Sequence, residues 1–418
     1  MEIKRDHYLN QLISRKHNGL IKIISGIRRC GKSYLLTELF RKHLLNENVK
    51  EDHIIHLALD DYDKKQYRNP DNCYNFVKSS IKDNDMYYLL LDEVQMMENF
   101  EDVLNGFLHI KNLDTYVSGS NSKFLSTDVI TEFRGRGDEI RIYPLSFSEF
   151  YSAVSGDWEE AWKEYYTYGG MPLTLLQKSD EEKVKYLKNL FSETYIRDIE
   201  ERNNIKNNDE LEELVDVLAS GIGCLVSPQK LSDTFKSIKH INISAPTVKQ
   251  YLNYLQDSFV LEKVLRYDIK GKKYINTPSK YYFTDVGLRN ARLNFRQLEE
   301  THLMENVIYN ELKIRGFQID VGELAVSEKS GQEYIQKKIE VDFIANKGNK
   351  KYYIQSALQM PTPEKQEQEK RPLLKIDDSF RKIVIVKDNI KPYYDEKGIG
   401  IIGLKDFLLN PNAFDELL

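Results

Sequence analysis

The sequence is poor in cysteine and lacks any long apolar stretch. Its three cysteines, Cys30, Cys73 and Cys224, are scattered and form no Cys-x-x-Cys pair. This excludes a disulfide framework and a cysteine zinc site, and it fits a reducing compartment. No apolar run approaches the roughly 18 residues that a membrane-spanning helix needs, and the start of the chain is charged where a signal peptide would be apolar. We therefore expect a cytoplasmic protein that does not contact a membrane.

The chain also lacks a strong excess of either charge. Its net charge of −5 excludes a uniformly basic coat for nucleic acid, although it allows a basic patch on one domain. The 41% of hydrophobic and 30% of charged residues are typical of a folded globular protein. A chain of 418 residues is too long for one hydrophobic core, so about two to three domains are expected.

The first half of the chain alternates strand-like and helical patterns. Over residues 1–150, β-type runs such as LIKIIS at 20–25 and YYLLLDE at 87–93 are separated by helical segments. This alternation predicts an α/β domain with a parallel sheet and helices on both faces. The glycine-rich segment GIRRCGKS within it is typical of the P-loop type. Residues 151–208 have a helical pattern with aromatic residues at helix-like spacing, which predicts a helical lid or linker with a packed aromatic core.

The second half predicts two smaller domains. In residues 209–292, capping signals at Asp209, Ser227 and Ser244 begin three helices, and two strand-like runs follow. This order is typical of a winged helix-turn-helix. Residues 293–418 begin with a helix and continue with the strand-like runs IEVDFIA, KYYIQSAL and KIVIVK, which predict a small α/β domain.

A glycine-rich segment carries the clearest chemistry. The residues GIRRCGKS, from Gly26 to Ser33, fit the pattern GxxxxGK[ST] between an apolar strand and a helical run. The glycines let backbone N–H groups turn toward phosphates, and the helix that follows offers its positive dipole end. Lys32 is expected to reach the β- and γ-phosphates, and Ser33 to coordinate Mg²⁺. The predicted ATP site comprises Gly26, Arg29, Cys30, Gly31, Lys32, Ser33 and Tyr34.

Two adjacent carboxylates follow a second apolar strand. Asp92 and Glu93 end the run YYLLLDE. Asp92 is expected to hold Mg²⁺ through water, and Glu93 to polarise the water that attacks the γ-phosphate. Plain surface charge is the alternative, but the glycine loop upstream argues against it. Together the two segments predict an ATPase.

Six segments together resemble the prokaryotic AAA+-type ATPases that carry a winged helix and a restriction-endonuclease-like C-terminal domain, relatives of the STAND-type switches. They are GIRRCGKS, LLLDEVQ, SGSNS, FRGRG, IYPLSFSEF and YGGMP. The resemblance covers nearly the whole chain. It implies that Asn121 is a polar sensor near the γ-phosphate, and that Arg134 and Arg136 are arginine fingers offered to a neighbouring subunit of a homo-oligomer. A turn asparagine and a solvated basic loop are the plain alternatives.

The C-terminal part resembles the PD-(D/E)xK nucleases, in which a helix Glu, a strand Asp and an (E/Q)xK element bind a divalent metal. Glu305, Asp342 and Gln355 match these positions, but Ala357 stands where the lysine belongs. Without that cation, nothing obvious positions the attacking water or offsets charge on the phosphate. The resemblance therefore implies a vestigial metal site without nuclease activity.

Three functions follow from these patterns. The favoured one is an ATPase whose nucleotide state drives oligomerisation or a domain rearrangement. DNA is a candidate partner because the hairpin of the winged helix is rich in cations: Arg266, Lys270, Lys272, Lys273 and Lys280. Packing against protein is the alternative use of a winged helix. An ATP-licensed nuclease and a switch that binds ATP without hydrolysis remain as alternatives. Ala357 argues against the first, and Asp92 with Glu93 against the second.

Overall fold

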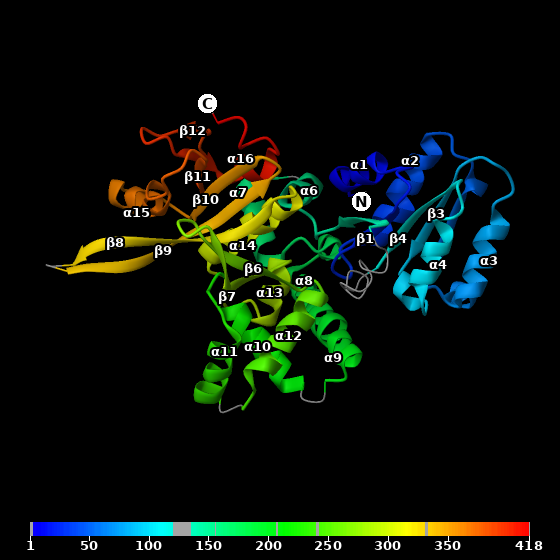
Figure 1. The fold of residues 1–418 in the computed structure, drawn as a ribbon, viewed down its shortest axis with the longest axis horizontal. Coiled ribbons are helices and arrows are strands. Elements are labelled where there is room, and N and C mark those ends of the chain that lie inside the picture. Colours follow the sequence, from blue (N-terminus) through cyan, green and yellow to red (C-terminus); the bar gives the residue numbers. More distant parts are fainter. Residues whose placement is uncertain are drawn as a thin grey trace. The chain divides into compact units, whose positions relative to one another are not determined.

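The chain divides into two compact units, which are described separately (Figure 1). The first comprises residues 1–144 with 257–259, and the second residues 145–256 with 260–418. The computed structural model describes residues 3–119, 135–154, 156–205, 208–239, 242–330 and 333–417. None of the helices in these ranges combines the length and the apolar character that crossing a bilayer requires.

The first unit is built around a five-stranded sheet with the order β2-β3-β4-β1-β5, in which all neighbours are parallel. The strands are β1 (Ile21–Ser25), β2 (Ile54–Ala58), β3 (Tyr87–Asp92), β4 (Leu113–Ser118) and β5 (Gly137–Arg141). Every residue of β1 and β3 is buried, as expected for central strands of a parallel sheet that helices cover. This strand order is typical of P-loop NTPases, and it confirms the predicted parallel α/β fold.

Helices pack on this sheet through their apolar sides. They are α1 (Asp6–Ser14), η1 (Tyr34–Phe40), α2 (Arg41–Asn46), η2 (Glu51–His53), η3 (Tyr62–Arg68), α3 (Pro70–Ser80), η4 (Val94–Met96) and α4 (Phe100–Phe107). One core cluster joins Leu89 and Leu91 of β3 to Leu104 and Phe107 of α4. The sheet is thereby held rigid beneath the loops that leave its carboxyl edge.

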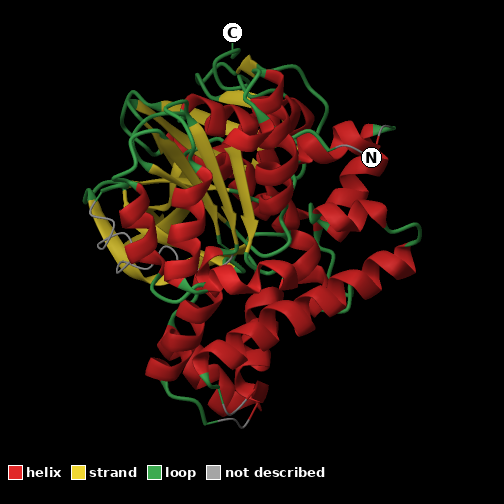
Figure 2. Cartoon of the chain, turned by 90° about the vertical axis from the view of Figure 1, so that its right-hand side faces the viewer, coloured by secondary structure: helices red, strands yellow, loops and turns green. Residues whose placement is uncertain are grey.

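The second unit begins with helices, which Figure 2 shows in red. They are α6 (Phe147–Val154), α7 (Trp158–Tyr168), η6 (Pro172–Leu176), α8 (Asp180–Asn189), η7 (Leu190–Ile196), α9 (Arg197–Asn203), α10 (Asn208–Ser220), α11 (Pro228–Thr234), η8 (Phe235–Lys239) and α12 (Ala245–Asp257). The aromatic residues near its start pack edge to face, with Phe147 4.8 Å from Trp158 and 5.3 Å from Tyr165 between ring centroids. The predicted aromatic core is therefore present.

Two of the three predicted helix caps after residue 208 are present. The side chain of Ser227 accepts from the Lys230 N–H, and that of Ser244 accepts from the Thr247 N–H. The prediction for Asp209 is wrong, because α10 already begins at Asn208 and places Asp209 in its first turn. A carboxylate there still interacts favourably with the positive end of the helix.

An eight-stranded mixed sheet follows, with the order β12-β13-β11-β10-β9-β8-β6-β7. Its strands are β6 (Leu261–Asp268), β7 (Lys273–Phe283), β8 (Gln318–Ser330), β9 (Glu333–Lys347), β10 (Lys350–Ala357), β11 (Arg381–Val386), β12 (Tyr393–Tyr394) and β13 (Gly400–Gly403). The helices between and after them are α13 (Val286–Arg292), α14 (Glu300–Ile314), α15 (Pro363–Leu374) and α16 (Leu404–Leu409). Because β6 pairs in parallel with β8, the hairpin predicted as a wing is continuous with the C-terminal strands.

Candidate nucleotide-binding site

The glycine-rich loop leaves the end of β1 in a conformation that requires glycine. Gly26 has φ 139° and Gly31 has φ 100°, values that side-chain-bearing residues rarely adopt. A Cβ atom at Gly26 would lie only 2.1 Å from the carbonyl oxygen of Ile142, the residue that follows β5. Arg29, exposed in the turn, is left-handed as well, with φ 67°. The loop therefore approaches its neighbour so closely that no side chain fits at Gly26.

The loop holds its lysine on the inside. Lys32 is 3% exposed, and its ammonium donates hydrogen bonds to the carbonyl oxygens of Gly26 at 2.9 Å and Ile27 at 3.1 Å. Ser33 already has helical dihedrals and precedes Tyr34, where η1 begins and then continues into α2. The Lys32 ammonium, which contacts neutral carbonyls, therefore lies next to backbone N–H donors and the positive end of this helical segment. Such an arrangement suits an anion with several oxygens.

Cys30, which we predicted as part of the nucleotide site, is directed into the first unit. It is completely buried, and its thiol lies 3.7 Å from the Ile142 carbonyl oxygen. Its own carbonyl oxygen accepts a hydrogen bond from the Arg5 guanidinium at 3.1 Å. The side chain of Cys30 therefore supports the loop, and any contact with a nucleotide would come from its backbone.

Asp92 and Glu93 share one partner on the neighbouring strand. Asp92 is the last residue of β3 and is 4% exposed. The Ser118 hydroxyl, at the end of β4, donates to Asp92 Oδ1 and accepts from the Glu93 N–H at 3.2 Å. Glu93 is left-handed, with φ 52°, and Gln95 Nε2 donates to its carboxylate. A non-glycine residue in this region is strained, and such strain is concentrated at functional sites.

Sequence reasoning missed both Ser118 and Gln95. The motif SGSNS drew attention to Asn121 through a family resemblance, whereas its first residue, Ser118, contacts the Asp92 carboxylate and the Glu93 N–H directly. A usable signal was present, because Ser118 ends the strand that lies between β1 and β3. Gln95 follows Glu93 by two residues and belongs to η4, so only the tight turn brings it back to the carboxylate.

The residues assigned to sensing and to the arginine fingers are only partly described. Asn121 and Arg134 lie outside the described residues. Arg136 is exposed just before β5, and its guanidinium is 3.5 Å from the Asn105 side-chain oxygen. Its exposure leaves the head group accessible from outside the first unit.

In the second unit, Glu305 and Asp342 lie around a lysine. Glu305 Oε1 accepts hydrogen bonds from Lys280 Nζ at 2.9 Å and from the Tyr282 hydroxyl at 2.6 Å. The same ammonium is 2.6 Å from Glu340 Oε1. Burial alone would lower the pKa of Lys280, but the carboxylates of Glu305, Asp342 and Glu340 together raise it. Lys280 is therefore a charged group that holds the acidic cluster together.

A β-bulge aims Asp342 at this cluster. The pairing of β8 with β9 shifts by one residue between Gly322↔Val341 and Asp320↔Ile344. Val341 and Ile344 both belong to one core cluster, so Asp342 and Phe343 lie together on the other face of the sheet. Burial, and then the nearby Glu305 carboxylate, raise the pKa of Asp342 to about 8.

Gln355 does not join Glu305 and Asp342. Alternation along β10 puts Gln355 on the same face as Tyr353 and Ala357, which belong to the core cluster with Leu373 of α15. Its Oε1 atom is buried without a hydrogen-bond partner. The predicted three-residue metal site is thus not assembled, because strand alternation directs its third member to the opposite face.

Two of the five predicted phosphate-binding cations of the hairpin are buried. Arg266 is 8% exposed and pairs with Glu323, and Lys280 is 2% exposed in the acidic cluster. The prediction is corrected for these two residues, since both charges are neutralised inside the sheet. Lys270, Lys272 and Lys273 remain exposed around the turn of the hairpin.

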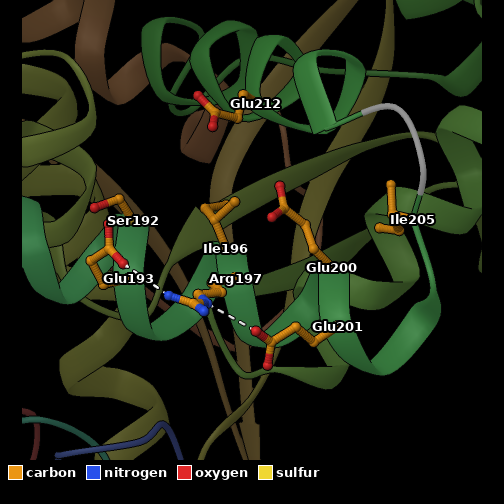
Figure 3. A pocket seen from close by; sticks show the side chains of 8 residues that line it. All are labelled: Ser192, Glu193, Ile196, Arg197, Glu200, Glu201, Ile205 and Glu212. Atoms are coloured by element: carbon orange, nitrogen blue, oxygen red, sulfur yellow. Dashed lines mark hydrogen bonds and ion pairs between the residues drawn. The ribbon is translucent and has the colours of Figure 1, made fainter.

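A separate cavity of about 470 Å³ lies in the second unit (Figure 3). It is lined by Ser192, Glu193, Ile196, Arg197, Glu200, Glu201, Ile205 and Glu212. Arg197 pairs with Glu193 at 3.5 Å and with Glu201 at 2.8 Å. Burial, followed by the charge of Glu212, raises the pKa of Glu200. None of the residues that we predicted for a site lines this cavity.

Comparison with known proteins identifies relatives over the whole chain. Residues 18–151 match a family model described as an AAA domain, and residues 159–299 match one described as a domain of unknown function. The chain is 32% identical to an uncharacterized protein of Haemophilus influenzae over 416 residues, covering 97% of this chain and 98% of the relative. It is 27% identical to an uncharacterized protein of Methanocaldococcus jannaschii over 390 residues, covering 88% and 82%. Similar solved structures include the Orc1 protein of Aeropyrum pernix in complex with DNA, with 10% identity and a TM-score of 0.30 over 70% of this chain and 93% of that one.

Proposed function

The chain belongs to the family of AAA-domain proteins that includes its Haemophilus influenzae relative, and we propose that it binds ATP with Mg²⁺ and hydrolyses it. One observation carries this proposal. The glycine loop, with Lys32 inside it, leaves the carboxyl end of β1, and Asp92 with Glu93 ends β3 at the same edge of the sheet. In open α/β sheets, ligands bind at this edge.

The residues at this edge suit a nucleoside triphosphate with its metal. The Gly26 position admits no Cβ, and the Lys32 ammonium is held by neutral carbonyls, so the loop offers N–H donors and a free positive charge. Ser33 and Asp92 would hold Mg²⁺, which offsets charge on the phosphates. Glu93, held on a strained backbone next to Ser118, would orient the attacking water. Lys32 and the loop would thus bind the phosphates, whereas Glu93 would activate the water.

Hydrolysis would then drive a conformational or oligomeric switch. Arg136 is exposed and close in sequence to β5, as a finger offered to a neighbouring copy in a homo-oligomer would be. Arg134 and Asn121 are assigned to the finger and to the γ-phosphate sensor on the family resemblance alone. The restriction-endonuclease-like assignment of the second unit has the same basis, whereas the winged-helix assignment rests on the order of its helices and strands along the chain.

Paired substitutions test the ATPase. Lys32→Ala should abolish ATP binding in isothermal titration, because it removes the charge aimed at the phosphates. Glu93→Gln should bind ATP like the wild type and release no phosphate, because only the water loses its base. Wild-type turnover in Glu93→Gln would refute the role of Glu93, and unchanged affinity in Lys32→Ala would refute the site.

DNA is a second candidate partner, favoured by the exposed hairpin lysines. Lys270, Lys272 and Lys273 lie within four residues of one another around the turn between β6 and β7. Exposed lysines on a turn suit contact with a phosphate backbone, which fixes position without reading sequence. Cleavage of that DNA is not part of the proposal, since Gln355 is directed away from Glu305 and Asp342.

A further inference from the structure

A residue near the start of the chain supports the phosphate loop from behind. Arg5 precedes α1 and is 3% exposed. Its guanidinium donates to the carbonyl oxygen of Cys30 at 3.1 Å and to that of Tyr143 at 2.7 Å, and it lies 4.7 Å from the ring centroid of Tyr8. One side chain therefore joins the phosphate loop to the segment that follows β5.

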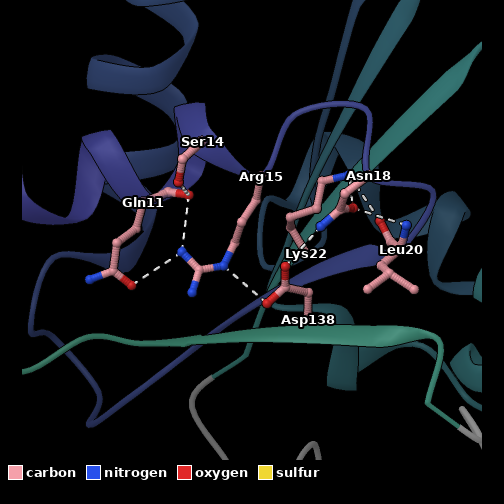
Figure 4. Close-up of polar contacts among 7 residues, drawn as sticks. All are labelled: Gln11, Ser14, Arg15, Asn18, Leu20, Lys22 and Asp138. Atoms are coloured by element: carbon pink, nitrogen blue, oxygen red, sulfur yellow. Dashed lines mark hydrogen bonds and ion pairs between the residues drawn. The ribbon is translucent and has the colours of Figure 1, made fainter. Parts of the chain in front are cut away.

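The helix that follows Arg5 is held near both ends, by Tyr143 after β5 and by Asp138 within β5. At its start, the Tyr8 hydroxyl accepts a hydrogen bond from the Tyr143 N–H at 3.1 Å. Past its end, Arg15 and Asn18 bind the two carboxylate oxygens of Asp138 at 3.0 and 2.8 Å (Figure 4). These two anchors, one within β5 and one just after it, hold α1 in place, so the position of Arg5 does not depend on its own two hydrogen bonds alone.

The bond from Arg5 to Cys30 sets the direction of a phosphate donor. In a trans peptide, the C=O and the N–H that follows it point in opposite directions. The Cys30 carbonyl points toward Arg5, so the Gly31 N–H points away from Arg5. In a glycine-rich phosphate loop, the backbone N–H groups are the groups that surround the phosphates. Freeing the Cys30 carbonyl would let this peptide rotate, because Gly31 tolerates many dihedral angles.

We propose that Arg5 is a positioning residue of the nucleotide site, which holds the Cys30–Gly31 peptide for phosphate binding and couples the loop to Tyr143. The coupling has a defined target, because Tyr143 lies directly before Pro144, where the first unit ends. The Ile142 carbonyl, one residue earlier, already contacts Gly26 and Cys30 of the loop. This inference rests on the proposed ATP binding and adds how the loop is held to the segment that follows β5.

Two substitutions of Arg5 with a matched control test this role. Arg5→Lys keeps the charge but loses the planar fork that reaches two carbonyls, and Arg5→Gln loses the charge. We expect both to raise the Kd for ATP and ADP with Mg²⁺ by about tenfold or more, since a charge-assisted hydrogen bond is lost. The control is Arg15→Lys, just past the other end of α1, where Arg15 contacts Asp138 of β5. It should bind ATP within about twofold of the wild type. Isothermal titration separates positioning from misfolding, because misfolding lowers the stoichiometry and leaves the Kd unchanged.

The outcomes distinguish this inference from the ATP site itself. If the wild type and Arg15→Lys fail to bind ATP, the proposed function is wrong. If they bind and both Arg5 variants show the wild-type Kd, the positioning role is wrong. Should neither Arg5 variant fold, hydrogen exchange of the wild type decides. ATP with Mg²⁺ should slow exchange of the first-turn amides of α1 together with those of the loop, and unchanged α1 exchange would refute the coupling.

Discussion

Lys32 in the first unit and Lys280 in the second are both buried, with 3% and 2% of their surface exposed. Their partners differ. The Lys32 ammonium donates to two neutral backbone carbonyls, whereas the Lys280 ammonium lies between the carboxylates of Glu305 and Glu340. A cation that carbonyls hold keeps its charge available for an anionic ligand. A cation that carboxylates surround is already neutralised, and it serves the fold. Although the two lysines are similarly buried, their partners predict ligand binding at Lys32 and a structural role at Lys280.

The largest expected effect is on the stability of the second unit. Lys280→Met should lower the free energy of unfolding by about 3–5 kcal/mol, because it leaves buried carboxylates without their cation. Affinity for ATP should be unchanged. Urea unfolding measures the first quantity and isothermal titration the second. Lys32→Met should show the reverse, with lost affinity and a stability change of about 1 kcal/mol or less.

Two further variants sharpen this comparison. Lys273→Met, at an exposed hairpin position, is the control and should leave stability within about 0.5 kcal/mol of the wild type. Glu305→Gln combined with Lys280→Met should recover part of the loss, because one buried charge is removed with its partner. Equal stability of Lys280→Met and Lys273→Met would contradict a structural role for Lys280.

A smaller effect concerns Asp285, a buried charge that backbone N–H groups hold. Its carboxylate accepts from the Gly170 and Leu288 N–H groups at 2.7 and 2.9 Å, yet burial raises its pKa from 3.8 to about 6. The folded protein therefore binds this proton more tightly than the unfolded chain. Between about pH 4 and 6, the free energy of unfolding should fall as the pH rises, by about 3 kcal/mol in total.

This pH dependence can be isolated with one variant. Asp285→Asn cannot titrate, so its unfolding free energy should lack this part of the slope when both proteins are measured from pH 4 to 7 in urea. The difference between the two curves removes the contribution of the other carboxylates. A constant difference across that range would show that Asp285 titrates at its ordinary pKa.

The smallest expected effect is on DNA. Replacing Lys270, Lys272 and Lys273 with Ala should weaken DNA binding. The affinity should also depend less steeply on salt concentration, because about three phosphate contacts are lost. Lys263→Ala, exposed on β6 away from the turn, is the matched control and should bind like the wild type. No variant should cut DNA with Mg²⁺ or Mn²⁺. Nicking by the wild type that disappears in Asp342→Ala would restore the acidic cluster as a nuclease site.

Local sequence was enough to predict that the glycine-rich loop follows one buried strand and that Asp92 and Glu93 stand at the end of another. Both lie within short segments whose chemistry depends on spacing along the chain, such as the spacing of Gly26 and Gly31 before Lys32. The parallel sheet followed from alternating strand and helix patterns, and the structure confirms it. The resemblance to the PD-(D/E)xK nucleases, and not local spacing, indicated that Ala357 leaves the C-terminal motif without its lysine.

Tertiary structure alone decided which cation meets Glu305 and what supports the loop. Lys280 reaches Glu305 because β7 joins the C-terminal sheet through β6, a pairing between segments far apart in sequence. Strand alternation turns Gln355 away, and Arg5 reaches Cys30 because α1 is held against β5 and the residues that follow it. A sequence motif predicts functional groups that lie close together along the chain. Charges that meet across a sheet are set by strand register and packing, which no short pattern records.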